Sequence, residues 1–181
     1  MIGLAFARTH PHDRPDATAM AADVVRLEND EAQALFGFVR RLGLTDEQAD
    51  DAVQEVFARL LAEQRRGILI ASPRSWAYQA IYRLAMDQHR LRRKIRALVG
   101  AIGRNRVADR HDDADRIAVW SEVDRLPPRQ RQIVYLRYRG DLAYEEIAGV
   151  LGISASAARS HATQAMATLR ARLAATIEDV R

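Results

Sequence analysis

The sequence predicts an all-α protein: two small helical domains joined by a charged flexible linker, the C-terminal domain being a helix-turn-helix. Good helix formers abound among the 181 residues, and only 6% are aromatic. Apolar residues recur at helical spacing in several segments, and we find no alternating strand pattern. Between about Ile95 and Ile117 the periodicity dissolves into Gly, Asn, Arg and Asp, which is typical of a linker.

These observations divide the chain into four predicted segments. Residues 1–23 are expected to form a flexible N-terminal tail, 24–94 a first helical domain, 95–117 the linker and 118–181 a second helical domain. In the tail, His10 and His12 flank Pro11, which is more typical of a frayed terminus than of a metal site.

The first domain begins with two predicted helices. From Leu27 to Leu42 apolar residues form a helical stripe, which Gly43 ends. Thr45, followed three residues later by Gln48, is a capping-box pattern that starts the next helix. The side predicted to be buried holds Ala49, Val53, Val56, Phe57, Leu60 and Leu61. The exposed side holds Asp50, Asp51, Gln54, Glu55 and Arg59, and by itself such a charged side is usually only solvated.

A third helix is predicted after the apolar connection at 67–71. Ser72 is its cap and Pro73 its first residue. The residues predicted to meet the core are Trp76, Ala80, Leu84 and Leu91, with Tyr78 and Tyr82 on another side. Four basic residues, Arg90, Arg92, Arg93 and Lys94, crowd positions 90–94. One would suit the helix dipole, but four repel one another and favour phosphate as a partner.

In the second domain, a helix from Val119 to Leu126 stops at Pro127-Pro128, and another ends near Gly140. A helix-turn-helix follows from Tyr144 to Leu173, with Gly152 in a left-handed turn and Ser154 as the next cap. The predicted core is Val123, Leu126, Ile133, Leu136, Ile147, Leu151 and Ile153.

The second helix of this motif has two distinct sides. Facing inward at helical spacing are Ala158, Ala162, Ala165, Leu169 and Leu173, a row that predicts close helix packing. Facing outward are Ser156, Arg159, Ser160 and Thr163, which are small or polar enough to approach base edges. This favours DNA binding over an ordinary helical hairpin without a ligand.

Composition limits the other functions. A formal net charge of +4 mildly favours a polyanionic partner. Because the chain has no cysteine, disulfides, thiolate zinc sites and cysteine nucleophiles are excluded. We expect no metal, no cofactor and no enzymatic activity, since the carboxylates near Asp50 have neither a pocket nor a His partner. No secretion signal or membrane-spanning run is found, and a cytoplasmic location fits.

Three segments together resemble bacterial sigma-70 family sigma factors, specifically the extracytoplasmic-function (ECF) group. They are DDAVQEVFARLL at 50–61, SPRSWAYQAIYRLAMDQHRLRRK at 72–94 and LPPRQRQIVYLRYRGDLAYEEIAGVLGIS at 126–154. The first and second are similar to the family's second conserved region and the third to its fourth region. The linker is too short for a globular third region, as expected for this group. The Ser-Pro-Arg start and the Arg-Ser-His stretch faintly resemble the iron-uptake subgroup.

The resemblance implies a role for each surface. The implied contacts to the clamp helices of the largest subunit of core RNA polymerase are Asp51, Gln54, Glu55 and Arg59. The implied contacts to the −10 element, which must be melted, are Arg74, Trp76, Tyr78, Tyr82, Arg83, Arg90, Arg92 and Arg93. Trp76 fits the core equally well. The implied contacts to the −35 element are Ser156, Arg159, Ser160, His161 and Thr163.

This chain departs from the family pattern in two places. Tyr82-Arg83 stands where the family commonly has an Arg-Asn pair, so a different −10 base preference is expected. The second helix continues Ala162-Thr163-Gln164-Ala165-Met166 instead of with basic residues. We therefore expect either fewer charged contacts to the −35 element or stronger reliance on polymerase.

The resemblance implies three partners: core RNA polymerase, promoter DNA and an anti-sigma protein, with no membrane insertion. Two alternatives stay open at this point. One is a sigma-like mimic that titrates an anti-sigma protein, and the other is a conventional helix-turn-helix regulator that uses the C-terminal domain alone.

Overall fold

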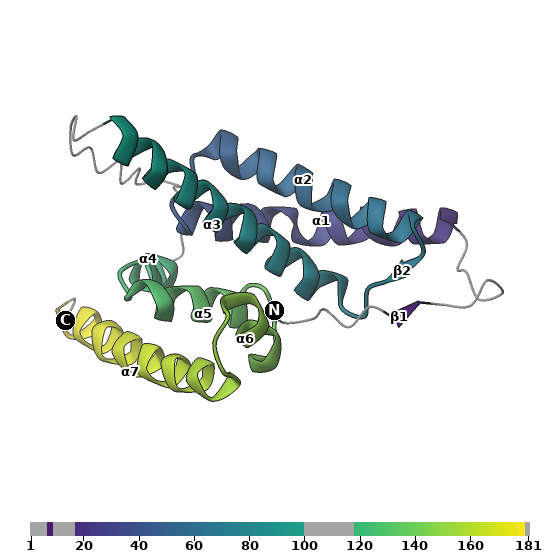
Figure 1. The fold of residues 1–181 in the computed structure, drawn as a ribbon. Helices are drawn as coiled ribbons and strands as arrows, with labels where there is room; N and C mark the ends of the chain where they lie inside the picture. Colours follow the sequence, from purple (N-terminus) through teal and green to yellow (C-terminus); the bar gives the residue numbers. More distant parts are fainter. Residues whose placement is uncertain (1–6, 9–16, 100–117, 180–181) are drawn as a thin grey trace. The chain divides into compact units, whose positions relative to one another are not determined.

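The computed structural model describes residues 7–8, 17–99 and 118–179. The chain divides into two compact units, Met1–Gly100 and Ala101–Arg181, and each is described by itself. The predicted all-α class is confirmed (Figure 1). Besides helices, the described residues include one short antiparallel strand pair. In it β1 (Ala7–Arg8) lies beside β2 (Ile68–Leu69), within the apolar connection that precedes the third helix.

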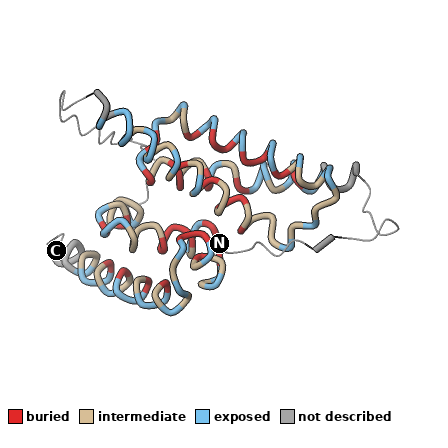
Figure 2. The backbone as a smooth tube through the Cα atoms, in the orientation of Figure 1, coloured by how far each residue is buried: buried red, intermediate tan, exposed pale blue. Residues whose placement is uncertain are grey.

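The first unit is a bundle of three helices, α1 (Ala17–Arg41), α2 (Asp46–Arg65) and α3 (Pro73–Val99). Each helix contacts the other two, and the buried side of each faces its neighbours (Figure 2). On α2, the predicted buried residues Ala49, Val53, Val56, Phe57 and Leu60 are buried, while Leu61 is half-buried.

Two predicted segment boundaries need correction. The helix α1 begins at Ala17, inside the tail predicted at 1–23, and Val24 is already buried. The helix α3 continues to Val99, inside the linker predicted from residue 95. Both extensions consist largely of good helix formers, which carry a helix beyond its last packed turn. The rest of the predicted tail, except β1, and the linker from residue 100 lie outside the described residues.

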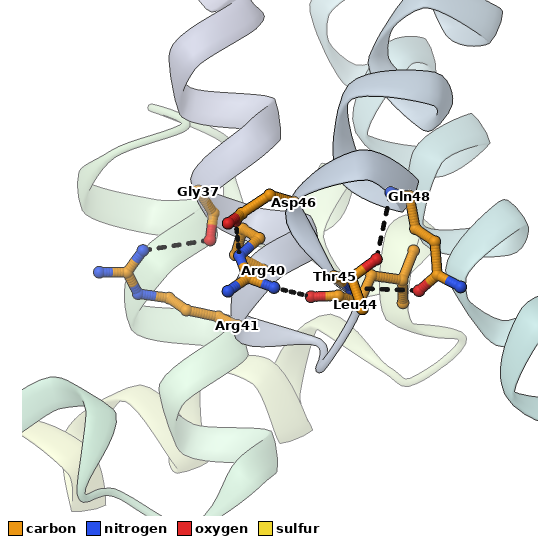
Figure 3. A network of polar contacts seen from close by, with 7 residues as sticks. All are labelled: Gly37, Arg40, Arg41, Leu44, Thr45, Asp46 and Gln48. Carbon is orange, nitrogen blue, oxygen red and sulfur yellow. Dashed lines mark hydrogen bonds and ion pairs between the residues drawn. The ribbon is translucent and has the colours of Figure 1, made fainter. Parts of the chain in front are cut away.

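The turn between α1 and α2 is fixed by polar contacts (Figure 3). The predicted capping box is present: Gln48 N donates to Thr45 Oγ1 at 3.3 Å, and Thr45 N donates to Gln48 Oε1 at 3.1 Å. Arg40 donates to the Leu44 carbonyl and pairs with Asp46 at 2.6 Å. Gly43 turns the chain at φ +92°, a conformation that L side chains rarely adopt.

The predicted core side of α3 is wrong by about a third of a turn. The buried residues are Ala77, Tyr78, Ile81 and Ala85. Trp76, Ala80 and Leu84 are only half-buried, and Leu91 is 58% exposed. This helix carries two apolar sides at helical spacing, and spacing alone does not choose between them. The aromatic and carboxylate partners of Tyr78 in α1 select the second side.

The second unit confirms the predicted helix-turn-helix. It comprises α4 (Ala118–Asp124), α5 (Pro128–Tyr138), α6 (Tyr144–Leu151) and α7 (Ala155–Asp179). Gly152 ends α6 in the left-handed conformation, at φ +65°. Ser154 caps α7 by accepting a hydrogen bond from Ala157 N at 3.1 Å. The predicted core residues are buried except Ile153, which is half-buried.

The alanine row of α7 predicts close packing against the neighbouring helices, which a larger side chain at one of these positions tests. Ala162 is 3% exposed, and α7 contacts α5 and α6. We expect Ala162→Leu to lower the free energy of unfolding by about 1–3 kcal/mol, because the larger side chain forces the helices apart. Ala167→Leu, at an exposed position of the same helix, should change it by less than about 0.5 kcal/mol.

Urea unfolding followed by the fluorescence of Trp120 measures this difference. A Trp76→Phe background makes Trp120 the single tryptophan, since the chain holds two. Equal effects of the two substitutions would contradict close packing at the alanine row.

Candidate nucleic-acid interface

The outer side of α7 is exposed where the sequence predicts it. Ser156, Arg159, Ser160 and Thr163 are exposed, while His161 is half-buried. The Nδ1 atom of His161 is buried and has no hydrogen-bond partner among the described residues. Thr163 Oγ1 donates to the Arg159 carbonyl at 3.0 Å, so its hydroxyl hydrogen is used within the helix. The four exposed residues therefore form a short polar surface, in which Arg159 is the cation.

That cation is held by the preceding helix. Arg159 Nη2 donates to Glu145 Oε1, and the Arg159 Cζ atom lies 5.6 Å from the centre of the Tyr144 ring. The Arg137 Cζ atom lies 5.5 Å from the same ring, so two guanidinium groups contact one aromatic face or edge. The first residues of α6 therefore fix the side chain that projects from α7.

A second candidate surface lies on α2. The four predicted contact residues, Asp51, Gln54, Glu55 and Arg59, are exposed and follow one another at turn spacing. Glu55 Oε1 accepts from Arg59 Nε at 2.5 Å, which orders two of the four side chains. The opposite side of α2 packs into the core, so this face has no role in the core and is free for a partner.

A third candidate surface is the basic half of α3. Arg83, Arg90 and Arg93 are exposed, and Arg90 pairs with Asp87 at 3.3 Å. The other two predicted arginines make contacts inside the unit. Arg74 pairs with Glu31 at 2.8 Å, and Arg92 donates to Gln48 and, at 3.3 Å, to the Gly43 carbonyl. These two cations thus help to hold α3 against α1 and the α1–α2 turn.

The aromatic residues of α3 differ in their exposure. Tyr78 is fully buried: its ring meets Phe38 edge-on at 5.7 Å, and its hydroxyl hydrogen-bonds to Glu31 Oε2 at 3.3 Å. Because no part of its ring reaches the surface, the structure does not support the predicted contact of Tyr78 with −10 DNA. Tyr82 is half-buried and stacks on Phe38 at 6.4 Å, and Trp76 is half-buried.

Sequence reasoning missed Tyr144, Glu145 and Glu31. The sequence patterns place the first two only at the start of the helix-turn-helix, and they give Glu31 no role. A usable signal existed for one of them: the turn of a helix-turn-helix folds the second helix back beside the first, so an acidic residue on α6 can meet Arg159. No comparable signal marks Glu31, whose partners are more than forty residues away along the chain.

Two other kinds of site are not found in the described part of the chain. There, no group of three His, Asp or Glu side chains is placed to hold a metal ion. Among the described helices, none is long and apolar enough to cross a membrane.

A helix-turn-helix whose outer face is polar and exposed is typical of DNA-binding transcription proteins. Two family models match the chain: "Sigma-70 region 2" at residues 29–96 and "Sigma-70, region 4" at residues 116–169. The chain belongs to the sigma-70 family, and these matches are of the ECF type. Members of this family are transcription initiation factors rather than enzymes.

Individual relatives agree with this assignment. RNA polymerase sigma factor SigV of Bacillus subtilis (strain 168) is 27% identical over 142 residues, which cover 76% of this chain and 81% of SigV. The fold resembles that of the sigma factor RpoE, solved in complex with the anti-sigma factor NepR from Bartonella quintana. That match has a TM-score of 0.61 and 21% identity over 83% of this chain and 96% of RpoE.

A second solved structure, CnrH in complex with the cytosolic domain of CnrY, has a similar fold. Its TM-score is 0.55 and its identity 23%, over 88% of this chain and 95% of CnrH. At these identities both structures bear on the fold alone.

The burial of Tyr78 predicts what its substitution does. Tyr78→Phe keeps the ring in the core and removes the hydroxyl that donates to the buried Glu31 carboxylate, so we expect the free energy of unfolding to fall by about 1.5–3 kcal/mol. Urea unfolding measures this loss. Promoter opening, measured at a temperature where the variant is folded, should equal that of the unsubstituted protein. Loss of opening with unchanged stability would show instead that the hydroxyl contacts DNA.

Proposed function

We propose that this chain is a dissociable initiation subunit that docks on core RNA polymerase through α2. In the proposal, α7 reads the −35 element, and α3 captures and melts the −10 element. The observation that carries the proposal is the presence of a region 2 and a region 4 in one chain, each with a face left outside its core.

The polymerase contact is assigned to Asp51, Gln54, Glu55 and Arg59 on α2. These side chains lie on the face opposite the core, and the Glu55–Arg59 pair orders part of the surface before binding. Ordering before binding lowers the conformational entropy lost on docking. A mixed acidic and basic face also fits a protein partner better than it fits DNA, whose phosphates repel carboxylates.

The −10 contact is assigned to the exposed side of α3. Arg83, Arg90 and Arg93 are cations available to the phosphates of a separated strand. Trp76 and Tyr82 are half-buried, so each residue keeps some accessible surface, and aromatic rings are the groups on which unpaired bases stack. Arg74 and Arg92 support this surface through their contacts within the unit and are not required to touch DNA.

The −35 contact is assigned to Ser156, Arg159, Ser160 and Thr163, with His161 at the edge. Small residues on either side of Arg159 let the helix backbone approach the floor of the major groove. The Arg159 guanidinium offers several donors to base acceptors, while the serine hydroxyls suit a base or a phosphate.

We further infer that the partners are core RNA polymerase, promoter DNA and an anti-sigma protein. We propose the last by analogy with the structural neighbour RpoE, which was solved bound to an anti-sigma factor. The proposed site of action is the cytoplasm. In this role the chain performs no covalent chemistry of its own and needs no cofactor.

The α2 assignment predicts the effect of removing two polar side chains. Gln54→Ala combined with Glu55→Ala should lower run-off transcription by about tenfold or more with purified core RNA polymerase, because the docking face loses central contacts. Fragments of the source genome serve as templates. Glu47→Ala, at an exposed position near the start of the same helix, is the matched control and should keep full activity.

Three other outcomes would redirect the assignment. Full activity of the double variant would place the polymerase contact elsewhere. No transcripts from the unsubstituted protein, despite tight binding to an anti-sigma protein, would identify a mimic. DNA binding without any polymerase association would leave a conventional regulator.

The α7 assignment predicts a promoter-specific defect. Arg159→Ala should weaken holoenzyme binding to promoters by about tenfold or more, through the loss of one bidentate base contact. Competition with promoters that carry single substitutions in the −35 element measures this defect. At one position of that element, the variant holoenzyme should bind promoters with different bases equally well. Uniform weakening at every position would show that Arg159 contacts phosphate and not a base.

A further inference from the structure

Two residues of α6 restrain the Arg159 side chain. Its Nη2 atom donates to Oε1 of Glu145, across the turn of the helix-turn-helix, and its Cζ atom lies 5.6 Å from the centre of the Tyr144 ring. Both partners of the ion pair remain on the surface, with 52% of the Arg159 side chain and 65% of the Glu145 side chain exposed. The guanidinium is therefore held from one side and stays accessible to a ligand.

Restraint matters because an arginine side chain is long and rotates freely. An unrestrained guanidinium loses much of that freedom when it binds, which weakens the contact. Glu145 takes one N–H in the described contact, and a guanidinium has five. Enough donors remain for the paired O6 and N7 acceptors of a guanine in the major groove.

Charge distinguishes the two ligands that DNA offers. Phosphate is attracted by net positive charge, and each neutralised phosphate releases counterions. A carboxylate beside the guanidinium offsets that charge and repels a phosphate. The acceptors of a base edge carry no net charge, so they are bound through hydrogen-bond geometry, which Glu145 leaves intact.

We propose that Glu145 is a positioning residue that directs Arg159 to a guanine base edge and away from the phosphate backbone. The Tyr144 ring assists by holding the same guanidinium against α6. The inference deepens the proposed function, since it rests on α7 reading the −35 element. A surface ion pair this exposed contributes little to folding, so its removal leaves the domain intact.

The test compares holoenzymes that carry Glu145→Gln, Glu145→Ala or Arg159→Ala with the unsubstituted holoenzyme. Two quantities are measured. One is discrimination, which is the ratio of two dissociation constants. The first is for a promoter in which 7-deazaguanine, which lacks the N7 acceptor, replaces one −35 guanine, and the second is for the unmodified promoter; each −35 guanine is replaced in turn. The other is the slope of log affinity against log salt on promoterless DNA. Glu63→Gln is the matched control, because it makes the same charge change at another surface pair, with Arg66 at 3.1 Å.

We expect both Glu145 variants to bind promoterless DNA more tightly, with a salt slope steeper by about 0.9, the value for one added phosphate contact. Discrimination at the guanine read by Arg159 should fall by about tenfold, within the range that one bidentate contact supplies. In the Arg159→Ala background, adding Glu145→Gln should leave discrimination unchanged and should alter the salt slope by less than it does when Arg159 is present. Glu63→Gln should match the unsubstituted protein.

The outcomes separate the two proposals. If Arg159→Ala changes discrimination at no guanine, the −35 role of Arg159 is wrong, and the role of Glu145 fails with it. If Arg159→Ala does change discrimination but the Glu145 variants change neither ratio nor slope, only the inference about Glu145 is overturned. The same holds if Glu145→Gln acts equally with and without Arg159, or if Glu63→Gln reproduces its effects.

Discussion

The contact between Tyr78 and α1 determines which face of α3 is available to a partner. Tyr78 packs edge-on against Phe38 at 5.7 Å, and Glu31 accepts from its hydroxyl while pairing with Arg74. Glu31 is itself buried, and a buried carboxylate must be paired and hydrogen-bonded. These contacts fix the rotation of α3 about its axis, so Arg83, Arg90 and Arg93 face outward.

In the second unit, too, the packed side of a helix determines which residues are exposed. There the alanine row of α7 lets the helices pack closely, and Gly152 makes the tight turn at φ +65° that sets their relative direction. Once these small residues have placed α7, its outer face follows, and Glu145 on α6 comes within reach of Arg159. In both units, the packed side of a helix decides which residues are offered to DNA.

The sequence predicts the placement of a residue when neighbouring residues determine that placement. It does not predict the placement of a residue whose contacts are with partners far away along the chain. The capping box at Thr45, the left-handed Gly152 and the exposed face of α7 follow from short-range patterns, and the structure has all three. Tyr78 was misplaced because α3 has two apolar sides, and the choice between them depends on Phe38 and Glu31, about forty residues earlier. Tyrosine also has a polar tip, so a surface position and a core position with a buried acceptor give the same sequence pattern.

The central claim is that the helix faces left outside the two cores are the binding surfaces, and site-specific photo-cross-linking tests it most directly. The chain has no cysteine, so one introduced at Ala58 or Asp87 carries a unique label beside the proposed polymerase surface or the proposed −10 surface, without replacing a residue assigned to either contact. In an open promoter complex, the Ala58→Cys label should cross-link to the largest polymerase subunit and the Asp87→Cys label to the −10 strands. An Asp87 label that reaches only protein, or an Ala58 label that reaches no polymerase subunit, would contradict the account.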